Sequence, residues 1–200
     1  MLDLGAGTGK LTRVLADRYA HVIAVEPLDE LRAILAERVP EADVLAASAE
    51  SIPLGDASVD GVFAGQAFHW FANDVALAEI SRVLRPSGAL ALLWNEDVDP
   101  SPLPDAYRRR LGELRAERPV EAIDEDILRR FPFGEEHKGA VPHEQVASRD
   151  DVLAFAASVS WIASRDDRAQ VLSELASLLP PGDYVFPKQT DVTWAIRLSD

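Results

Sequence analysis

The chain contains no cysteine, which excludes disulfide bonds and thiolate chemistry. It also lacks any apolar run near the roughly 20 residues that a membrane-spanning helix needs, and it shows no secretory signal pattern. We therefore expect a soluble cytoplasmic protein without a membrane partner.

Basic residues are the minority, with 20 Lys and Arg against 34 Asp and Glu, for a net charge of −14. An acidic surface of this kind repels nucleic acid. The densest basic cluster, residues 108–110, has acidic neighbours and is interpreted as a solvated helix face. These charges predict a small-molecule partner and no nucleic-acid partner, and they do not predict an oligomeric state.

Apolar runs alternate with segments of helical spacing along residues 1–96. The predicted strands cover residues 2–4, 21–25, 44–47, 59–64 and 89–94, and residues 85–88 are predicted to form a turn. Helices are predicted after the first two strands and after Asn73, which is a suitable N-cap residue. Strands that are apolar throughout indicate an α/β fold with a parallel sheet covered on both faces.

The remaining residues, 97–200, have a different character. A proline-rich loop at 100–104 precedes a predicted helix with its apolar face at 103–114, and the acidic segment 121–126 is predicted to be exposed. Strands are predicted at 137–147 and 191–198, and helices at 149–155 and 165–179. We interpret the chain as a single domain, 1–200, with a cofactor-binding half (1–96) and a half of substrate-side helices and C-terminal strands (97–200).

The first ten residues have the pattern of a ligand-binding loop. The strand Leu2–Leu4 leads into Gly5, Gly7 and Gly9, and a helix follows at once. Glycines allow backbone N–H groups to approach a ligand closely, and a helix N-terminus favours a negative group. Because buried strands usually run about 5–6 residues, we expect the chain to begin inside its own first strand, as if truncated at its N-terminus.

Three glycine-loop chemistries compete for this motif. A phosphate-binding P-loop is rejected, because Leu4 occupies its first glycine position and Leu11 replaces its hydroxyl residue. A dinucleotide-binding loop needs a third glycine where this chain has Lys10. Glu26 ends the second strand, where a carboxylate can accept both ribose hydroxyls. That feature does not separate NAD from S-adenosylmethionine, whereas the glycine spacing favours the latter.

Five motifs occur in order: 3–9 (DLGAGTG), 25–27 (VEP), 48–53 (SAESIP), 66–70 (QAFHW) and 84–88 (LRPSG). Together they resemble class I S-adenosylmethionine-dependent methyltransferases of methyltransferase type 11, in the trans-aconitate methyltransferase-like small-molecule group. Residues 1–96 match closely in pattern and residues 97–200 in outline. The resemblance implies a Rossmann-like, mostly parallel seven-stranded sheet with helices on both faces and a C-terminal antiparallel hairpin.

The resemblance also implies roles for individual residues. The glycine loop would hold the methionine part of the cofactor, Glu26 the ribose, and the segment after the third strand the adenine. In that segment Ser48 replaces the usual acid, so the backbone of Ala49, or Glu50, would have to recognise the adenine amine. The predicted cofactor-binding residues are Asp3, Gly5, Gly7, Thr8, Glu26, Pro27, Ser48, Ala49, Glu50 and Gln66.

Substrate-side residues are predicted with alternatives left open. His69 is the candidate general base, since its ordinary pKa lies near neutrality; the alternative is a packing or orienting role. Trp70 is a candidate pocket wall or core residue, and Asn95 a candidate substrate contact or loop cap. No metal is predicted, because the acidic and histidine residues at 135–144 do not have the spacing of a metal-ligand motif. These residues are Glu135, Glu136, His137, His143 and Glu144.

These observations predict S-adenosylmethionine-dependent methyl transfer to an oxygen, nitrogen or carbon atom of a small molecule. One alternative is a vestigial protein of this fold that holds the cofactor weakly or not at all. A second alternative is an NAD-dependent oxidoreductase.

Overall fold

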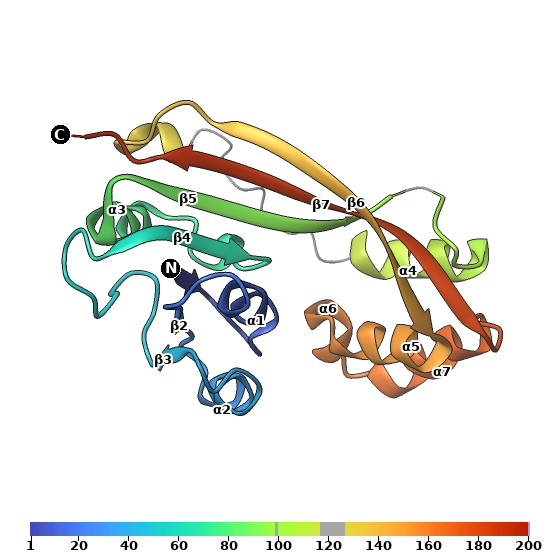
Figure 1. Cartoon of the computed structure of the whole chain (residues 1–200). Coiled ribbons are helices and arrows are strands. Elements are labelled where there is room, and N and C mark those ends of the chain that lie inside the picture. Colours follow the sequence, from blue (N-terminus) through green and yellow to red (C-terminus); the bar gives the residue numbers. More distant parts are fainter. Residues whose placement is uncertain (99, 117–126, 200) are drawn as a thin grey trace. The chain divides into compact units, whose positions relative to one another are not determined.

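The computed structural model describes residues 1–98, 100–116 and 127–199, so the predicted acidic segment 121–126 lies outside the described residues. Figure 1 shows a seven-stranded sheet with the order β3-β2-β1-β4-β5-β7-β6. Its strands are β1 (Leu2–Leu4), β2 (Ile23–Val25), β3 (Asp43–Leu45), β4 (Val59–Gly65), β5 (Leu84–Asp97), β6 (His137–Ser148) and β7 (Asp183–Ile196). The helices are α1 (Lys10–Ala16), α2 (Asp29–Arg38), η1 (Phe68–Trp70), α3 (Asp74–Val83), α4 (Asp105–Ala116), η2 (Ile127–Arg130), α5 (Arg149–Ser158), α6 (Ser160–Ala163) and α7 (Arg168–Ser177).

The first five strands are parallel, as the apolar runs predicted. Leu2 of β1 is in register with Ile23 of β2 on one side and with Val62 of β4 on the other. The chain therefore winds outward from β1 in both directions, and ligands of such sheets bind where the winding reverses, beyond the carboxyl ends of the strands. The predicted Rossmann-like sheet with a C-terminal antiparallel hairpin is confirmed.

Residues 85–88, predicted to form a turn, are an irregular part of β5 in which Ser87 has a left-handed backbone (φ +66°). Val59 faces Leu84, while Gly61 two positions later faces Ala89, so the register shifts here. The N–H of Ser87 donates to the Arg197 carbonyl at 3.0 Å, and the N–H of Arg197 donates to the Gly88 carbonyl at 2.8 Å. Pairing with residues that lie far along the chain keeps this segment in the sheet.

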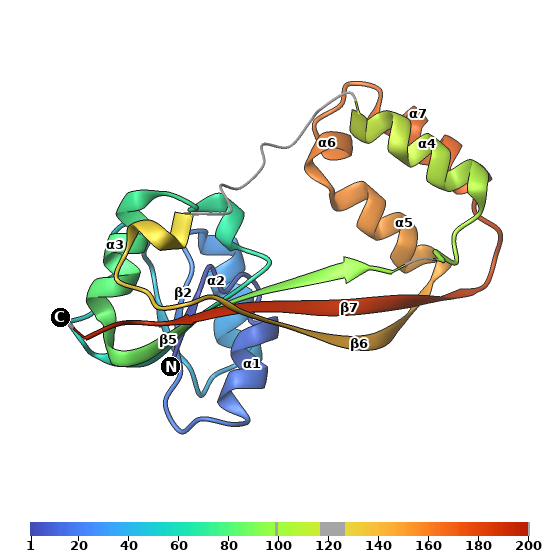
Figure 2. The same ribbon diagram turned by 90° about the horizontal axis from the view of Figure 1, so that it is seen from above.

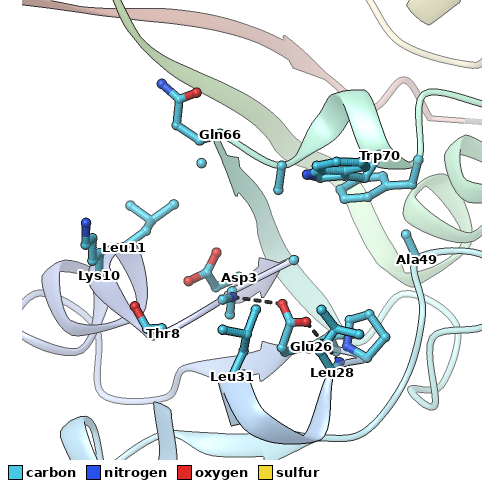
Figure 3. A pocket seen from close by; sticks show the side chains of 18 of the residues that line it. Asp3, Thr8, Lys10, Leu11, Glu26, Leu28, Leu31, Ala49, Gln66 and Trp70 are labelled. Atoms are coloured by element: carbon cyan, nitrogen blue, oxygen red, sulfur yellow. Dashed lines mark hydrogen bonds between the residues drawn. The ribbon is translucent and has the colours of Figure 1, made fainter. Parts of the chain in front are cut away.

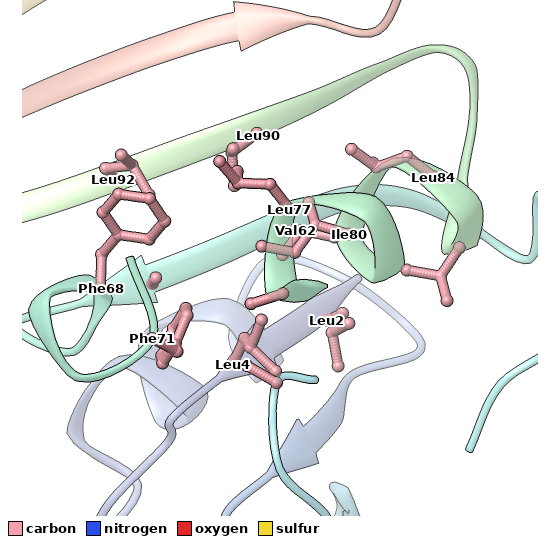
Figure 4. Packing of buried hydrophobic residues seen from close by; sticks show 14 of the residues in the cluster. Leu2, Leu4, Val62, Phe68, Phe71, Leu77, Ile80, Leu84, Leu90 and Leu92 are labelled. Carbon is pink, nitrogen blue, oxygen red and sulfur yellow. The ribbon is translucent and has the colours of Figure 1, made fainter. Parts of the chain in front are cut away.

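Helix α3 covers one face of the parallel strands. Leu77 and Ile80 of α3 are fully buried, and Figure 4 shows them directed toward the strands that carry Val62 and Leu90. The helix begins as predicted, because the Asn73 side chain accepts a hydrogen bond from the N–H of Ala76 at 2.9 Å. On the opposite face, Leu35 of α2 packs with Ala24. Val39, the residue that follows α2, belongs to the same cluster.

Arg82 and Glu79 of α3 also hold the loop between β3 and β4. The Arg82 guanidinium donates to the carbonyls of Ile52 (2.9 Å) and Leu54 (2.7 Å) and to the Asp56 carboxylate (2.9 Å). Glu79 accepts from Arg82 and from the N–H of Ile52 at 2.9 Å. This group of side chains, the α3 clamp, fixes the path of the loop.

The chain divides into two units. Unit 1 comprises the described residues of 1–95, 123–140 and 190–200, and unit 2 those of 96–122 and 141–189. Unit 2 has its own core, in which Tyr107 and Leu114 of α4 pack with Val152 of α5 and Leu175 of α7. Figure 2 shows these helices gathered together.

Most elements predicted for residues 97–200 are found in the structure. Helix α4 and strand β6 match, and α5 extends to Ser158. Helix α7 begins later than predicted, α6 was not predicted, and β7 begins eight residues before Asp191. Within the described residues, no helix is both long enough and apolar enough to cross a bilayer.

Candidate active site

Unit 1 contains a cavity of about 960 Å³ at the carboxyl ends of its parallel strands. Its walls come from the loops after β1, β2, β3 and β4, from α1 and α2, and from β5 and β7. Figure 3 shows several of the lining side chains. Twelve of the thirteen predicted site residues line it: Asp3, Gly5, Gly7, Thr8, Glu26, Pro27, Ser48, Ala49, Glu50, Gln66, Trp70 and Asn95.

The glycine loop forms the tight turn that its spacing predicted. Gly5, Gly7 and Gly9 have φ of +71°, +56° and +82°, values that glycine adopts without strain. A Cβ at Gly5 would lie 2.7 Å from the Cβ of Ala67, and one at Gly9 would lie 2.5 Å from Leu35 Cδ1. A Cβ at Gly7 would meet no neighbouring atom within 4 Å in the part of the chain that the structure describes. Gly5 and Gly9 therefore allow close packing of the fold, while Gly7 borders open space.

Glu26 holds the glycine loop from the end of β2. Its Oε2 accepts the N–H of Gly7 at 2.9 Å, and its Oε1 accepts the N–H of Leu28 at 3.0 Å, as the dashed lines in Figure 3 show. The side chain is buried. Because a carboxylate oxygen has two lone pairs, each oxygen can accept a further hydrogen bond from a ligand in the cavity.

Asp3 is a buried acid beneath the same loop. The hydroxyl of Thr12 donates to Asp3 Oδ2 at 2.6 Å and so joins β1 to α1. Burial raises the pKa of Asp3 to about 6, although the Thr12 hydrogen bond opposes this rise, and the negative charge of Glu26 adds to it. The pKa of Asp3 therefore lies well above the ordinary value of an aspartate carboxyl group.

The loop after β3 contributes Ser48, Ala49 and Glu50 to the wall. The Asn73 side-chain amide donates to Glu50 Oε1 at 3.0 Å. This hydrogen bond is the main reason why the pKa of Glu50 lies below its ordinary value. Asn73 thus caps α3 with its oxygen and orients a cavity carboxylate with its nitrogen, a double role that the sequence pattern did not predict.

Three uncharged polar residues meet where β4 ends: Gln66 follows β4, Asn95 lies near the end of β5, and Thr190 lies in the middle of β7. Gln66 has a left-handed backbone (φ +56°), which is uncommon outside glycine, and its amide donates to the backbone carbonyl of Asn95 at 3.1 Å. The hydroxyl of Thr190 donates to Asn95 Oδ1 at 2.7 Å. Thr190 was not predicted, because the residues around it in the sequence give no sign of its contact with Asn95, which lies 95 positions away.

His69 does not line the cavity. Its ring lies beside those of Trp70 (centroids 4.8 Å apart) and Trp94 (5.6 Å). Burial lowers its pKa, which favours a neutral ring. Trp70 is 77% exposed and lines the cavity, whereas the neighbouring His69, which is also exposed, does not line it.

Several lining residues were not singled out from the sequence. They are mostly apolar, and Val14 illustrates the signal that was present. It has the helical spacing of a core residue but is 48% exposed, because its side of α1 borders the cavity. The unpredicted lining residues are Ala6, Lys10, Leu11, Val14, Val25, Leu28, Leu31, Ala47, Gly65, Ala67, Phe71, Leu93 and Thr190.

Comparison with known proteins agrees with this architecture. A family model described as a methyltransferase domain matches residues 2–92. An uncharacterised methyltransferase-like protein of Schizosaccharomyces pombe is 36% identical over 189 residues, which cover 90% of this chain and 73% of that protein. The solved structure of a candidate type II methyltransferase from Anaeromyxobacter dehalogenans, 29% identical, matches with a TM-score of 0.77 over 100% of this chain and 90% of that chain.

A further relative, an uncharacterised methyltransferase of Mycobacterium bovis, is 50% identical over 114 residues, which cover 57% of this chain but 45% of that protein. The chain thus spans less than half of this relative's length. The chain belongs to the class I methyltransferases, the family that its motifs resembled. The predicted enzyme class, a methyltransferase, is confirmed.

Proposed function

We propose that the protein transfers a methyl group from S-adenosylmethionine to a small-molecule acceptor. The methionine part of the cofactor would lie over the glycine loop, its ribose at Glu26, and its adenine against residues 48–50. The observation that carries this proposal is the open space at Gly7, which lines the cavity and whose N–H donates to Glu26. A missing side chain at that point leaves room for a ligand to approach the backbone.

The charges on the cavity wall support this cofactor over a dinucleotide. Among the described lining residues, three are acidic and one is a lysine. The acids are Asp3, Glu26 and Glu50, and the lysine is Lys10. S-adenosylmethionine carries a sulfonium and an ammonium group, which such carboxylates stabilise. The diphosphate of NAD is an anion and would be repelled by the same acids.

The cofactor supplies the methyl group and the leaving sulfur of an in-line displacement. Positive charge is lost from the donor as the methyl group leaves, so the protein contributes mainly by aligning donor and acceptor. Trp70 and Asn95 line the part of the cavity at the ends of β4 and β5 and would contact the acceptor, while Gln66 beside them would contact the cofactor.

Calorimetric titration tests the proposal. We expect S-adenosylhomocysteine to bind and NADH not to bind, and we expect Gly7→Ala to weaken the binding at least tenfold. Gly182→Ala is the matched control, because Gly182 also has a positive φ and open space around it but does not line the cavity. Binding of NADH alone would refute the proposal, and binding of neither ligand would favour a vestigial protein. A mass-spectrometric search for metabolites that gain a methyl group would then identify the acceptor.

A further inference from the structure

Thr12 of α1 is a fully buried residue that touches the candidate site through another side chain. It is not among the described residues that line the cavity. Its hydroxyl donates to Asp3 Oδ2 at 2.6 Å, a distance typical of a hydrogen bond to a carboxylate. Asp3 is 1% exposed and nevertheless lines the cavity. Any influence of the Thr12 hydroxyl on a ligand would therefore be exerted through Asp3.

The charges around Asp3 do not include a cationic partner. Burial and, to a smaller extent, the negative charge of Glu26 raise the pKa of Asp3, while the Thr12 hydrogen bond lowers it. Lys10 at the start of α1 and Glu50 after β3 are the other charged residues in the described lining of the cavity. The residues beside Asp3 on β2 and β4 are uncharged. No cationic side chain of the described residues forms an ion pair with Asp3.

A cationic group of a ligand would supply the missing partner. S-adenosylmethionine carries an ammonium group on its methionine part, which we place over the glycine loop above Asp3. A positive charge beside a carboxyl group favours the ionised form, so binding below about pH 6 would release a proton from Asp3. The Thr12 hydroxyl has one proton to donate and gives it to Oδ2, which leaves Asp3 Oδ1 available to the ligand.

We propose that Thr12 is a positioning residue for cofactor binding. Its hydroxyl holds the ionised Asp3 carboxylate toward the ammonium group of the cofactor, and binding in mild acid expels the Asp3 proton to solvent. This inference rests on the proposed function, because it assigns a proton exchange to the same cofactor site.

Two ligands separate this role from a general effect on the cavity. S-adenosylhomocysteine carries the ammonium group, whereas 5′-methylthioadenosine shares its adenosine and thioether sulfur but lacks that group. The ammonium group stays protonated between pH 5 and pH 7. Ionisation of an acid with a pKa of about 6 should therefore make S-adenosylhomocysteine bind about five- to tenfold tighter to the natural protein at pH 7 than at pH 5, as measured by calorimetry. The affinity for 5′-methylthioadenosine should change by less than about twofold.

Asp3→Asn identifies the group that titrates. Because asparagine cannot ionise, the variant should bind S-adenosylhomocysteine with the same affinity at pH 5 and pH 7. A pH dependence that persisted in this variant would assign the proton to another acid of the cavity and overturn the inference. A natural protein that binds S-adenosylhomocysteine equally well at both pH values would overturn it as well.

Thr12→Val tests the positioning role, because valine keeps the shape and removes the hydroxyl. At pH 7 we expect the affinity for S-adenosylhomocysteine to fall about three- to tenfold and the midpoint of its pH profile to rise by about 0.5–1 pH unit. The affinity for 5′-methylthioadenosine should not change. Thr12→Ser keeps the hydroxyl and should restore the natural profile. Thr193→Val is the control, since Thr193 is half-buried in β7 but does not line the cavity.

The outcomes of these titrations are distinguishable. Equal weakening of both ligands in folded Thr12→Val, or an unchanged pH profile, would overturn the positioning role. Thr12→Ala is a second variant without the hydroxyl, for the case that valine prevents folding. Failure of the natural protein to bind S-adenosylhomocysteine at either pH would instead refute the proposed function.

Discussion

Glu26 and Gly7 are joined by a hydrogen bond of 2.9 Å between a carboxylate that follows β2 and an N–H of the loop that follows β1. The same carboxylate accepts the N–H of Leu28. Glu26 therefore shapes the glycine loop before any ligand arrives, and its proposed contact with ribose is added to that structural role. A variant at this position should change both properties.

We expect Glu26→Ala to lower the affinity for S-adenosylhomocysteine at least tenfold, because hydrogen bonds to a charged group contribute about 1.5–3 kcal/mol each. The free energy of unfolding of the ligand-free protein should also fall, by about 1–3 kcal/mol, because two backbone donors lose their partner. Calorimetry and urea unfolding measure the two effects. Glu30→Ala, on the exposed side of α2, is the control. A folded Glu26→Ala variant with unchanged affinity would rule out the ribose contact.

The raised pKa of Asp3 predicts a pH-dependent stability. An acid whose pKa rises from 3.8 to about 6 on folding destabilises the folded state when it is ionised. This penalty is absent below about pH 4, grows between about pH 4 and 6, and is complete above about pH 6, where it is of the order of 3 kcal/mol.

Asp3→Asn tests this linkage, because asparagine keeps an oxygen for the Thr12 hydroxyl but cannot ionise. We expect the variant to be more stable than the natural protein at pH 7.5 and the difference to shrink toward pH 4, as measured by urea unfolding at both values. A difference that does not depend on pH would contradict the assignment. The gain in stability should come with weaker cofactor binding, since the carboxylate would be lost from the cavity.

Glu50 is the acid that we expect to recognise the adenine amine. The natural protein should bind S-adenosylhomocysteine at least tenfold tighter than S-inosylhomocysteine, which lacks that amine, and Glu50→Ala should abolish most of this preference. Asn73→Ser keeps a cap for α3 but loses the amide that orients Glu50, so it should reduce the preference with little loss of stability. If Glu50→Ala retained the full preference, the backbone of Ala49 would be the better candidate.

His69 is expected to support Trp70 by packing. His69→Phe keeps a ring of similar size and should retain turnover within about threefold, whereas loss of a general base typically lowers turnover by about 10²–10⁴-fold. The assay needs the acceptor that the metabolite search identifies. A large loss of turnover in His69→Phe, with unchanged binding of S-adenosylhomocysteine, would restore His69 as the base.

The features predicted correctly from the sequence depend on neighbours along the chain. The glycines of the first loop, the Asn73 cap and the apolar runs of β1, β4 and β5 each impose their structure within a few residues. The end of β2 at Glu26 follows from the same alternation. These local signals were sufficient to predict the carboxyl-end cavity and twelve of the 25 residues that line it.

The features that were missed depend on distant partners. The strand predicted at 89–94 begins earlier, at Leu84, because Arg197 pairs with Ser87 and Gly88 and keeps the irregular segment 85–88 in β5. Thr190 enters the site through a strand that returns from the far end of the sequence. His69 was predicted as a candidate base from its residue type, but within the short helix η1 it is Trp70 that lines the cavity, while the His69 ring lies beside those of Trp70 and Trp94.

The α3 clamp has a consequence for local opening of the molecule. The loop that carries Glu50 has few backbone hydrogen bonds of its own, and its N–H and carbonyl at Ile52 are both bound to side chains of α3. The helix and the loop should therefore open as one cooperative unit in native-state hydrogen exchange. The amide of Ile52 would then exchange as slowly as the amides at the centre of α3. Unfolding of α3 would therefore remove the surface proposed for adenine, although no described residue of α3 lines the cavity.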